Sequence, residues 1–224
     1  MIKNILNLGD AALYCDFGNE VNKTTNTQVI KYFQSIKKEN IEGINNLTPS
    51  YNKLIISFDL KKTNYINLKK KIENLNVDIK DSFKNKEIEI PVCSDQNFSL
   101  DIKRLEKRLK LSVEKIYENF YNKKFFCYMT GFIAGMPFLG DLDKNMRAER
   151  LETPRVKVPK GSVGLTEQFA NIYTFESPGG WNIIGNTPVN IFDSSNEKNP
   201  NLINPGDTVI FKSITKDQYK NFNE

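Results

Sequence analysis

The C-terminal hundred residues consist of short β-rich runs that glycine and proline interrupt repeatedly. Runs of this length, separated by turn residues, are typical of a barrel or a sandwich. The six runs are Phe125–Met129, Val156–Val158, Ile172–Phe175, Trp181–Ile184, Val189–Phe192 and Thr208–Phe211. We therefore expect this part of the chain to form a closed or stacked β structure.

Residues 1–84 predict a smaller α/β domain with a sandwich arrangement. Two strands are expected at Ala11–Phe17 and Leu54–Phe58, where β-rich runs lie next to turn residues. Two helices are expected from apolar side chains at helical spacing, namely Val29, Ile30, Phe33 and Ile36, then Tyr65, Leu68, Ile72 and Leu75. Thr25 or Thr27 is expected to cap the first helix. Two helices on one face of a small sheet form an α+β sandwich.

A polar and charged stretch, Asp78 to Lys86, predicts a linker, so the second domain is expected to span 85–224. Its first strand, Glu87–Val92, alternates apolar and polar residues. Two helices near the start of this domain are predicted next, on apolar residues at helical spacing. These residues are Ile102, Leu105 and Leu109, then Val113, Ile116, Tyr117 and Phe120, with Ser112 as the N-cap of the second helix.

The sequence contains no histidine, which restricts its chemistry. Ser-His-Asp triads, Cys-His pairs and histidine zinc sites are excluded, so carboxylates, Lys, Tyr, Ser, Cys or backbone amides must act instead. The three cysteines, Cys15, Cys93 and Cys127, are far apart and lie within apolar stretches. They predict buried reduced thiols, and neither a disulfide framework nor a metal site is expected.

Charge and hydropathy indicate the kind of partner. The net charge is +5, and the densest lysine cluster, between Lys61 and Lys71, is interrupted by apolar residues. A solvated helix face explains that cluster better than a phosphate-binding patch, so nucleic acid is not an expected partner. No apolar run approaches the ~20 residues that span a bilayer, and the first residues lack a signal-peptide pattern. We expect a cytoplasmic protein that does not bind membranes.

The segment from Gly131 to Thr187 carries the densest glycine and proline pattern. Such loops can present backbone amides to an anion, although the same residues also form ordinary turns. Arg155, whose backbone follows the rigid Pro154, could bind a carboxylate or phosphate or form a surface ion pair. Trp181, directly after two glycines, could fill the core or offer a stacking surface.

Four ordered motifs carry a resemblance to a known family. They are Gly131-Phe132-x-x-Gly135-x-Pro137-Phe138-Leu139-Gly140, Pro154-Arg155-x-x-Val158-Pro159-x-Gly161-Ser162-Val163-Gly164, Ser177-Pro178-Gly179-Gly180-Trp181 and Pro205-Gly206-Asp207. In this order the chain resembles the family of 5-oxoprolinase B subunits. That family also contains the Kip-type sensor-kinase inhibitors and the allophanate hydrolase subunit 1 (carboxyltransferase C and D) domains.

The resemblance implies a small N-terminal α/β domain followed by a cyclophilin-like β-barrel. It implies that the chain is the B subunit of a 5-oxoprolinase complex that converts 5-oxo-L-proline, ATP and water into L-glutamate, ADP and phosphate. The implied partners are the C subunit of 5-oxoprolinase, in direct contact, and the A subunit. ATP is implied for the complex, and the chain itself has no GxxxxGK[ST] loop.

The resemblance also places the motif residues along a groove of the barrel. The residues expected to bind substrate are Phe132, Gly135, Phe138, Gly161, Tyr173, Ser177, Pro178, Gly179, Gly180 and Trp181. Arg155, Ser162 and the Gly179–Gly180 backbone are the candidates for stabilising a developing oxyanion. Glu176, or less strongly Glu167, is the acid–base candidate.

Two other members of the family suggest different functions. A Kip-type inhibitor would dock on a sensor kinase through exposed apolar side chains, for which Met136 and Phe169 are candidates. A urea-carboxylating or allophanate-processing complex is the third possibility. The chain departs from the family pattern over Gly164–Asn171 and at Asn119–Asn122, where the family has a histidine.

Overall fold

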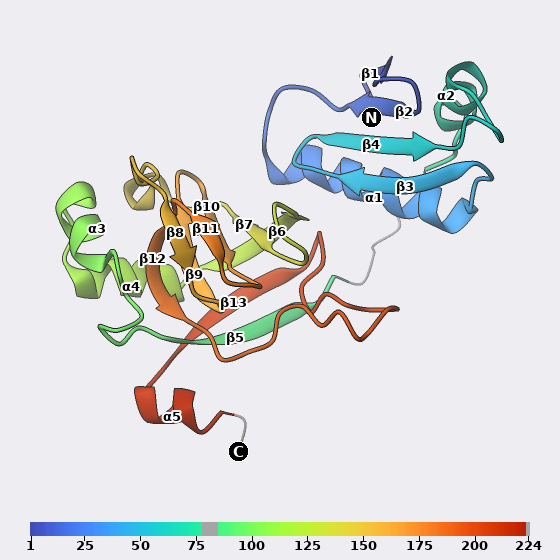
Figure 1. Ribbon diagram of the computed structural model, residues 1–224. Coiled ribbons are helices and arrows are strands. Elements are labelled where there is room, and N and C mark those ends of the chain that lie inside the picture. The colour runs from blue at the N-terminus through green and yellow to red at the C-terminus, as the bar shows by residue number, and fades with distance from the viewer. Residues whose placement is uncertain (78–84, 223–224) are drawn as a thin grey trace. The chain divides into compact units, whose positions relative to one another are not determined.

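The structure, a computed structural model, describes residues 1–77 and 85–222. The chain divides into two units, Met1–Lys84 and Asn85–Glu224 (Figure 1), and each is described by itself. The expected linker, 78–86, lies outside the described residues except for its last two positions.

An antiparallel sheet with strand order β1-β2-β4-β3 forms the first unit. The strands are β1 (Asn4–Asn7), β2 (Ala12–Asp16), β3 (Ile44–Pro49) and β4 (Lys53–Phe58). Burial alternates along β2 and β4, so one face of the sheet is covered. The two predicted strands are confirmed. The pattern missed β1 and β3, because asparagine interrupts the apolar alternation in both.

Helices α1 (Lys23–Glu39) and α2 (Tyr65–Glu73) supply the apolar side chains that cover this face. α1 packs on β3 and β4, and α2 packs on β2. Both predicted helices are confirmed, but the predicted cap of the first is wrong. Asn22 caps α1, because its extended backbone lets its side chain accept a hydrogen bond from the Thr25 N–H at 2.9 Å.

The second unit is a closed barrel with strand order β10-β7-β6-β13-β5-β12-β9. Its first and last strands, β5 and β13, run parallel, and the other described pairs are antiparallel. A separate two-stranded sheet pairs β8 with β11. The elements are β5 (Glu87–Cys93), α3 (Ile102–Leu109), α4 (Val113–Tyr121), β6 (Lys124–Thr130), β7 (Pro137–Gly140), the 3-10 turn η1 (Lys144–Met146), β8 (Arg155–Val158), β9 (Ser162–Thr166), β10 (Phe169–Ile172), β11 (Ser177–Gly179), β12 (Asn182–Asn186), β13 (Thr208–Ile214) and α5 (Lys216–Lys220).

The barrel interior and the helices α3 and α4 share one apolar core. Phe120 of α4 stacks on Phe211 of β13 with ring centroids 4.7 Å apart. Ser112 caps α4 as predicted, accepting a hydrogen bond from the Lys115 N–H. The expected barrel and both expected helices are confirmed.

Two predicted strands are wrong. Ile172–Phe175 is displaced, because the strand β10 ends at Ile172. Val189–Phe192 is not a strand: its apolar residues fill the core from a turn in which Thr187 Oγ1 accepts a hydrogen bond from the Val189 N–H. The pattern also missed β11, whose Ser-Pro-Gly sequence is typical of a turn. Its pairing is irregular between Ser177 and Gly179, where proline has no N–H to donate.

The stacked rings make Phe120 a sensitive test of the core. We predict that Phe120→Ala lowers the free energy of unfolding by about 3–5 kcal/mol, because loss of a buried aromatic side chain leaves a cavity. Phe222→Ala, at a 45% exposed ring, should change it by no more than about 0.5 kcal/mol. Urea denaturation of both variants measures this, and equal losses would contradict the described core.

Candidate functional site

A second, smaller apolar cluster lies on the outer face of the barrel. Adjacent residues of a strand point to opposite faces, and on β12 Ile184 belongs to the interior core whereas Ile183 belongs to the outer cluster. The β8–β11 sheet contributes Val158 to this outer cluster. Trp181 is 8% exposed and meets Phe138 edge to face at 5.6 Å, so its indole packs as a core side chain. The outer cluster is the floor of the site described next.

Tyr173 joins two of the sequence motifs. Its backbone N–H donates to the Ser162 carbonyl at 2.9 Å, and its carbonyl accepts from the Gly161 N–H at 2.7 Å. Its hydroxyl reaches the β11 strand, where a Cβ added to Gly179 would lie 2.2 Å from Tyr173 Oη. The structure therefore brings Tyr173, Gly161, Ser162 and Gly179 together.

Burial raises the pKa of the Tyr173 phenol above its ordinary value. The side chain of Asn171, the backbone of Trp181 and the charges of Arg150 and Arg155 oppose this rise. At neutral pH the phenol keeps its proton and can donate a hydrogen bond to a ligand.

Arg155 forms an ion pair with Asp101, with 2.7 Å between Arg155 Nη2 and Asp101 Oδ1. The Asp101 side chain is only 5% exposed, and its Oδ2 accepts from the Ile183 N–H at 2.7 Å. This pair is buried on its acidic side, unlike the surface ion pair that the sequence left open. Asp101 thereby fixes the orientation of the Arg155 guanidinium.

Three polar atoms of this region are buried without a hydrogen-bond partner in the described part of the chain. They are Arg155 Nη1, Ser177 Oγ and Asn171 Oδ1. A buried donor that makes no hydrogen bond costs about 1–3 kcal/mol, and a ligand oxygen could relieve that cost. Buried polar atoms of the site thus lack hydrogen-bond partners, which favours binding of a ligand with several oxygen atoms.

The thiols are poor candidates for chemistry. Cys15, Cys93 and Cys127 are buried and unpaired. Burial raises the pKa of Cys15 to about 12 and raises the pKa of Cys127 as well. The thiolate is the reactive form, so Cys15 and Cys127 are not nucleophiles at neutral pH.

Residues 1–77 and 85–222 hold no cluster of three or more His, Cys, Asp or Glu side chains that could bind a metal ion. No helix in the same ranges has the length and apolar character of a membrane span.

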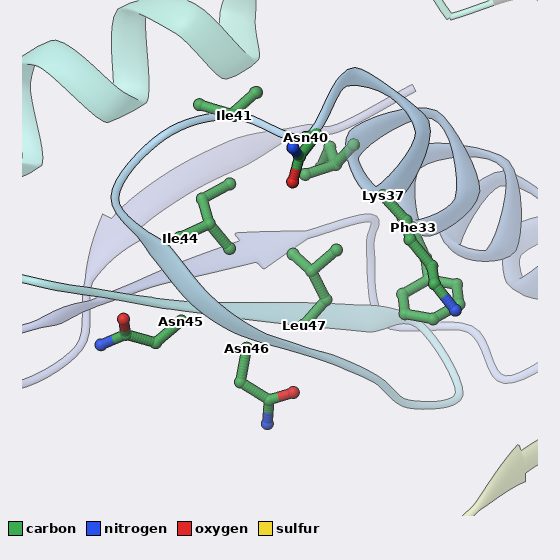
Figure 2. Close-up of a pocket in the computed structure, with 9 residues that line it drawn as sticks. Phe33, Lys37, Asn40, Ile41, Ile44, Asn45, Asn46 and Leu47 are labelled. Atoms are coloured by element: carbon green, nitrogen blue, oxygen red, sulfur yellow. The ribbon is translucent and has the colours of Figure 1, made fainter. Parts of the chain in front are cut away.

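A pocket of about 310 Å³ in the first unit lies apart from the predicted site residues. Figure 2 shows Ile44 and Leu47 on the strand that follows the loop with Asn40 and Ile41, and all four residues line this pocket. Lys37 is the one charged residue of its lining, which is otherwise apolar side chains and asparagine. The lining residues of this pocket include no carboxylate.

The family model of the carboxyltransferase domain, subdomain C and D, matches residues 3–203. The chain belongs to this family. Among its relatives, the 5-oxoprolinase B subunit of Bacillus subtilis is 30% identical, over 97% of this chain and 95% of the relative. The B subunit of Haemophilus influenzae 5-oxoprolinase is 33% identical, over 93% of this chain and 96% of the relative. The resemblance drawn from the four motifs is confirmed.

A solved structure, that of TTHA0988, has a similar fold. Its TM-score is 0.82 at 27% identity, and the match covers 92% of this chain. The chain spans only 40% of TTHA0988, which is a longer polypeptide. This family member therefore corresponds to one part of that larger chain.

Two of the predicted site residues of this family member have no contact with Arg155 among the interactions of the described residues. Phe132 is 71% exposed, and its backbone has a left-handed conformation. Gly135 of the same loop faces the ring of Phe192. Glu176 is exposed and forms an ion pair with Lys157 at 2.9 Å.

The anchors suggested for a Kip-type inhibitor need correction. Met136 is 1% exposed and packs in the outer cluster, and Phe169 is half-buried. Met136 is no exposed anchor, because the strand that it precedes turns its side chain onto the barrel surface. Phe132 is the more exposed apolar residue of that loop.

Sequence reasoning missed the roles of two residues. Asp101 occupies the N-cap position of α3, where a carboxylate normally caps its own helix, but it makes no such bond here. Arg150 stands out in the sequence only as a cation near the second motif. Neither role is visible in the local pattern.

The paired glycines give a matched test of the site. Gly179→Ala should destabilise the second unit by about 1–3 kcal/mol, because the new methyl group would collide with the Tyr173 hydroxyl. Gly180→Ala should be tolerated, since its nearest atom is 3.5 Å away. Urea denaturation followed by Trp181 fluorescence compares them. Equal stability of the two variants would contradict the Tyr173–Gly179 contact.

Proposed function

We propose that this chain acts as the B subunit of an ATP-dependent 5-oxoprolinase that opens 5-oxo-L-proline to L-glutamate, with ADP and phosphate as the other products. The supporting observation is the similarity to a 5-oxoprolinase B subunit across 97% of this chain and 95% of the Bacillus subtilis relative. The location of Arg155, Tyr173 and Gly179 at one site adds a chemical reason.

The lactam of 5-oxoproline is a stabilised amide, and water attacks it slowly. Phosphorylation of the lactam oxygen by ATP makes the ring carbon a better electrophile. Water then adds to this carbon, and negative charge develops on the oxygen of the added water as its proton leaves. The ring C–N bond breaks with transfer of a proton to the nitrogen, and a second water hydrolyses the resulting acyl phosphate to L-glutamate and phosphate. Fixed cations and N–H groups aimed at the oxygen on which charge develops lower the barrier, because they need no reorganisation during the reaction.

Arg155 meets this requirement on this chain. Asp101 holds Arg155 Nη2, and the buried Arg155 Nη1 has no hydrogen-bond partner within the described residues. A donor fixed in this way can stabilise an oxyanion without first losing another bond. We assign Arg155 to the oxygen of the lactam carbon, with the Tyr173 hydroxyl as a second donor.

The other candidates take weaker roles. Ser162 is 2% exposed and supports Tyr173 through its backbone carbonyl. Glu176 would have to leave Lys157 before it could act as an acid or base. Glu167, an exposed residue with φ 44°, is on the turn between β9 and β10.

A composite site shared with the C subunit of 5-oxoprolinase, in a complex that includes the A subunit, completes the proposal. The chain has no nucleotide loop of the GxxxxGK[ST] type, so ATP is a co-substrate of the complex. Phe132, Val156 and Phe175 are 71%, 80% and 42% exposed and offer apolar anchors. An obligate interface should bury on the order of 2,000 Å² or more.

Reconstitution tests the proposal. The chain mixed with the A and C subunits should release glutamate from 5-oxoproline only when ATP is present, and the chain alone should release none. Arg155→Gln should lower kcat by about 10²–10³-fold, as expected for loss of an oxyanion donor. Glutamate release is followed by a coupled assay.

Lys212→Gln is the matched control, since Lys212 is an exposed cation paired with Glu89 on the barrel surface. It removes one positive charge and should leave kcat unchanged. Undiminished glutamate release without this chain would overturn the assignment and would make kinase inhibition the leading alternative.

A further inference from the structure

We infer that Arg150 binds the carboxylate of the substrate. Arg150 and Arg155 then bind the two polar groups of a small lactam carboxylic acid, its carboxylate and its lactam oxygen. This inference rests on the proposed function. It assigns Arg150 as a specificity-determining residue and names the ligand class as a monocarboxylate.

The backbone around Arg150 is held rigidly against the barrel. The Leu151 N–H donates to the Gly180 carbonyl at 2.7 Å, and Asn182 Nδ2 donates to the Glu149 carbonyl at 3.0 Å. Arg150 therefore leaves the chain from a fixed point beside the second glycine of the Gly179–Gly180 pair.

The Arg150 side chain lies over Gly180. A Cβ added to Gly180 would be 3.5 Å from Arg150 Nε and 3.6 Å from Arg150 Nη2. The guanidinium forms no ion pair or side-chain hydrogen bond within residues 1–77 and 85–222, and the residue is exposed. Its donors are free for a ligand.

The charges around the two arginines differ. Arg155 is balanced by Asp101, whereas Arg150 has no such partner among the described residues. The adjacent carboxylate of Glu149 pairs with Arg108 instead. Arg104, whose Nη2 donates to the Arg150 carbonyl at 3.5 Å, also forms no ion pair among the described residues. The positive charge on this side of the site is therefore uncompensated, which suits a carboxylate.

The two arginines lie along the glycine pair. Gly179 is opposite Arg155 in the β8–β11 sheet, and a Cβ added to Gly180 would be 3.5 Å from Arg150 Nε. The positive charges of both arginines oppose the rise in the pKa of the Tyr173 phenol. In 5-oxoproline the carboxylate and the lactam oxygen flank the ring nitrogen, one on each side. Arg150 takes the carboxylate, for which a guanidinium fork is well shaped, and Arg155 takes the lactam oxygen.

The role of Arg150 is tested by measuring KM and kcat separately in the reconstituted complex. Arg150→Gln should raise KM for 5-oxoproline about 10- to 100-fold, the loss expected for a hydrogen-bonded charge pair. It should change kcat less than about threefold and leave KM for ATP unchanged. Arg150→Lys should fall between, since it keeps the charge and loses the fork. Inhibition by 2-pyrrolidinone, a lactam without a carboxylate, should be the same in all three proteins.

Lys103→Gln is the control, because it removes an exposed cation from the neighbouring helix α3. An unchanged KM for 5-oxoproline in Arg150→Gln, or an equal rise in KM for ATP, would overturn the inference. Equilibrium dialysis of 5-oxoproline against the complex without ATP separates the two proposals. If the unsubstituted complex binds 5-oxoproline more tightly than the Arg150→Gln complex, the carboxylate site stands. If the same unsubstituted complex then releases no glutamate when ATP is added, the proposed function fails.

Discussion

The site depends on the two hydrogen bonds that the Asp101 carboxylate accepts. One oxygen accepts from the Arg155 guanidinium and the other from the Ile183 N–H, and both distances are 2.7 Å. It therefore ties the start of α3 to β8 and β12 at one point. Burying a carboxylate costs free energy unless such bonds satisfy it, so the pair adds little net stability. Its main effect is to orient the Arg155 guanidinium.

Arg155 and Arg150 have different roles on the outer face of the barrel, because only Arg155 pairs with Asp101. Arg155 is neutralised and fixed, which suits a donor that must stand ready for charge developing in a reaction. Arg150 is unpaired among the described residues and exposed, which suits recognition of an anion that arrives already charged. The glycine pair lies beside both arginines, and the Tyr173 hydroxyl packs against Gly179. In the proposed complex, the remaining groups of the reaction come from the partner proteins.

Local patterns predicted the described helices α1 to α4 and some of the strands, but they missed β1, β3, β7, β9 and β11. Helical spacing and a serine cap located α4, and alternation located β5, because both signals depend on near neighbours in sequence. The β11 strand escaped prediction, since Ser-Pro-Gly is ordinary turn chemistry and only the partner strand makes it a strand. The Asp101–Arg155 pair joins residues 54 positions apart and was invisible to any local pattern. The motifs identified the family, whereas the geometry was needed to separate the residues around Arg155 from those, such as Phe132, on the exposed loop.

A double-mutant cycle on Asp101→Asn and Arg155→Gln tests the central claim, that Asp101 acts by orienting Arg155. The rate of ATP-dependent glutamate release is measured in the reconstituted complex for each variant and for the double variant, beside the unfolding midpoint of each. The account predicts that both single substitutions lower kcat and that the double variant is no slower than Arg155→Gln, with a coupling energy of about 0.5–3 kcal/mol. Losses that multiply, or full activity in Asp101→Asn, would contradict it.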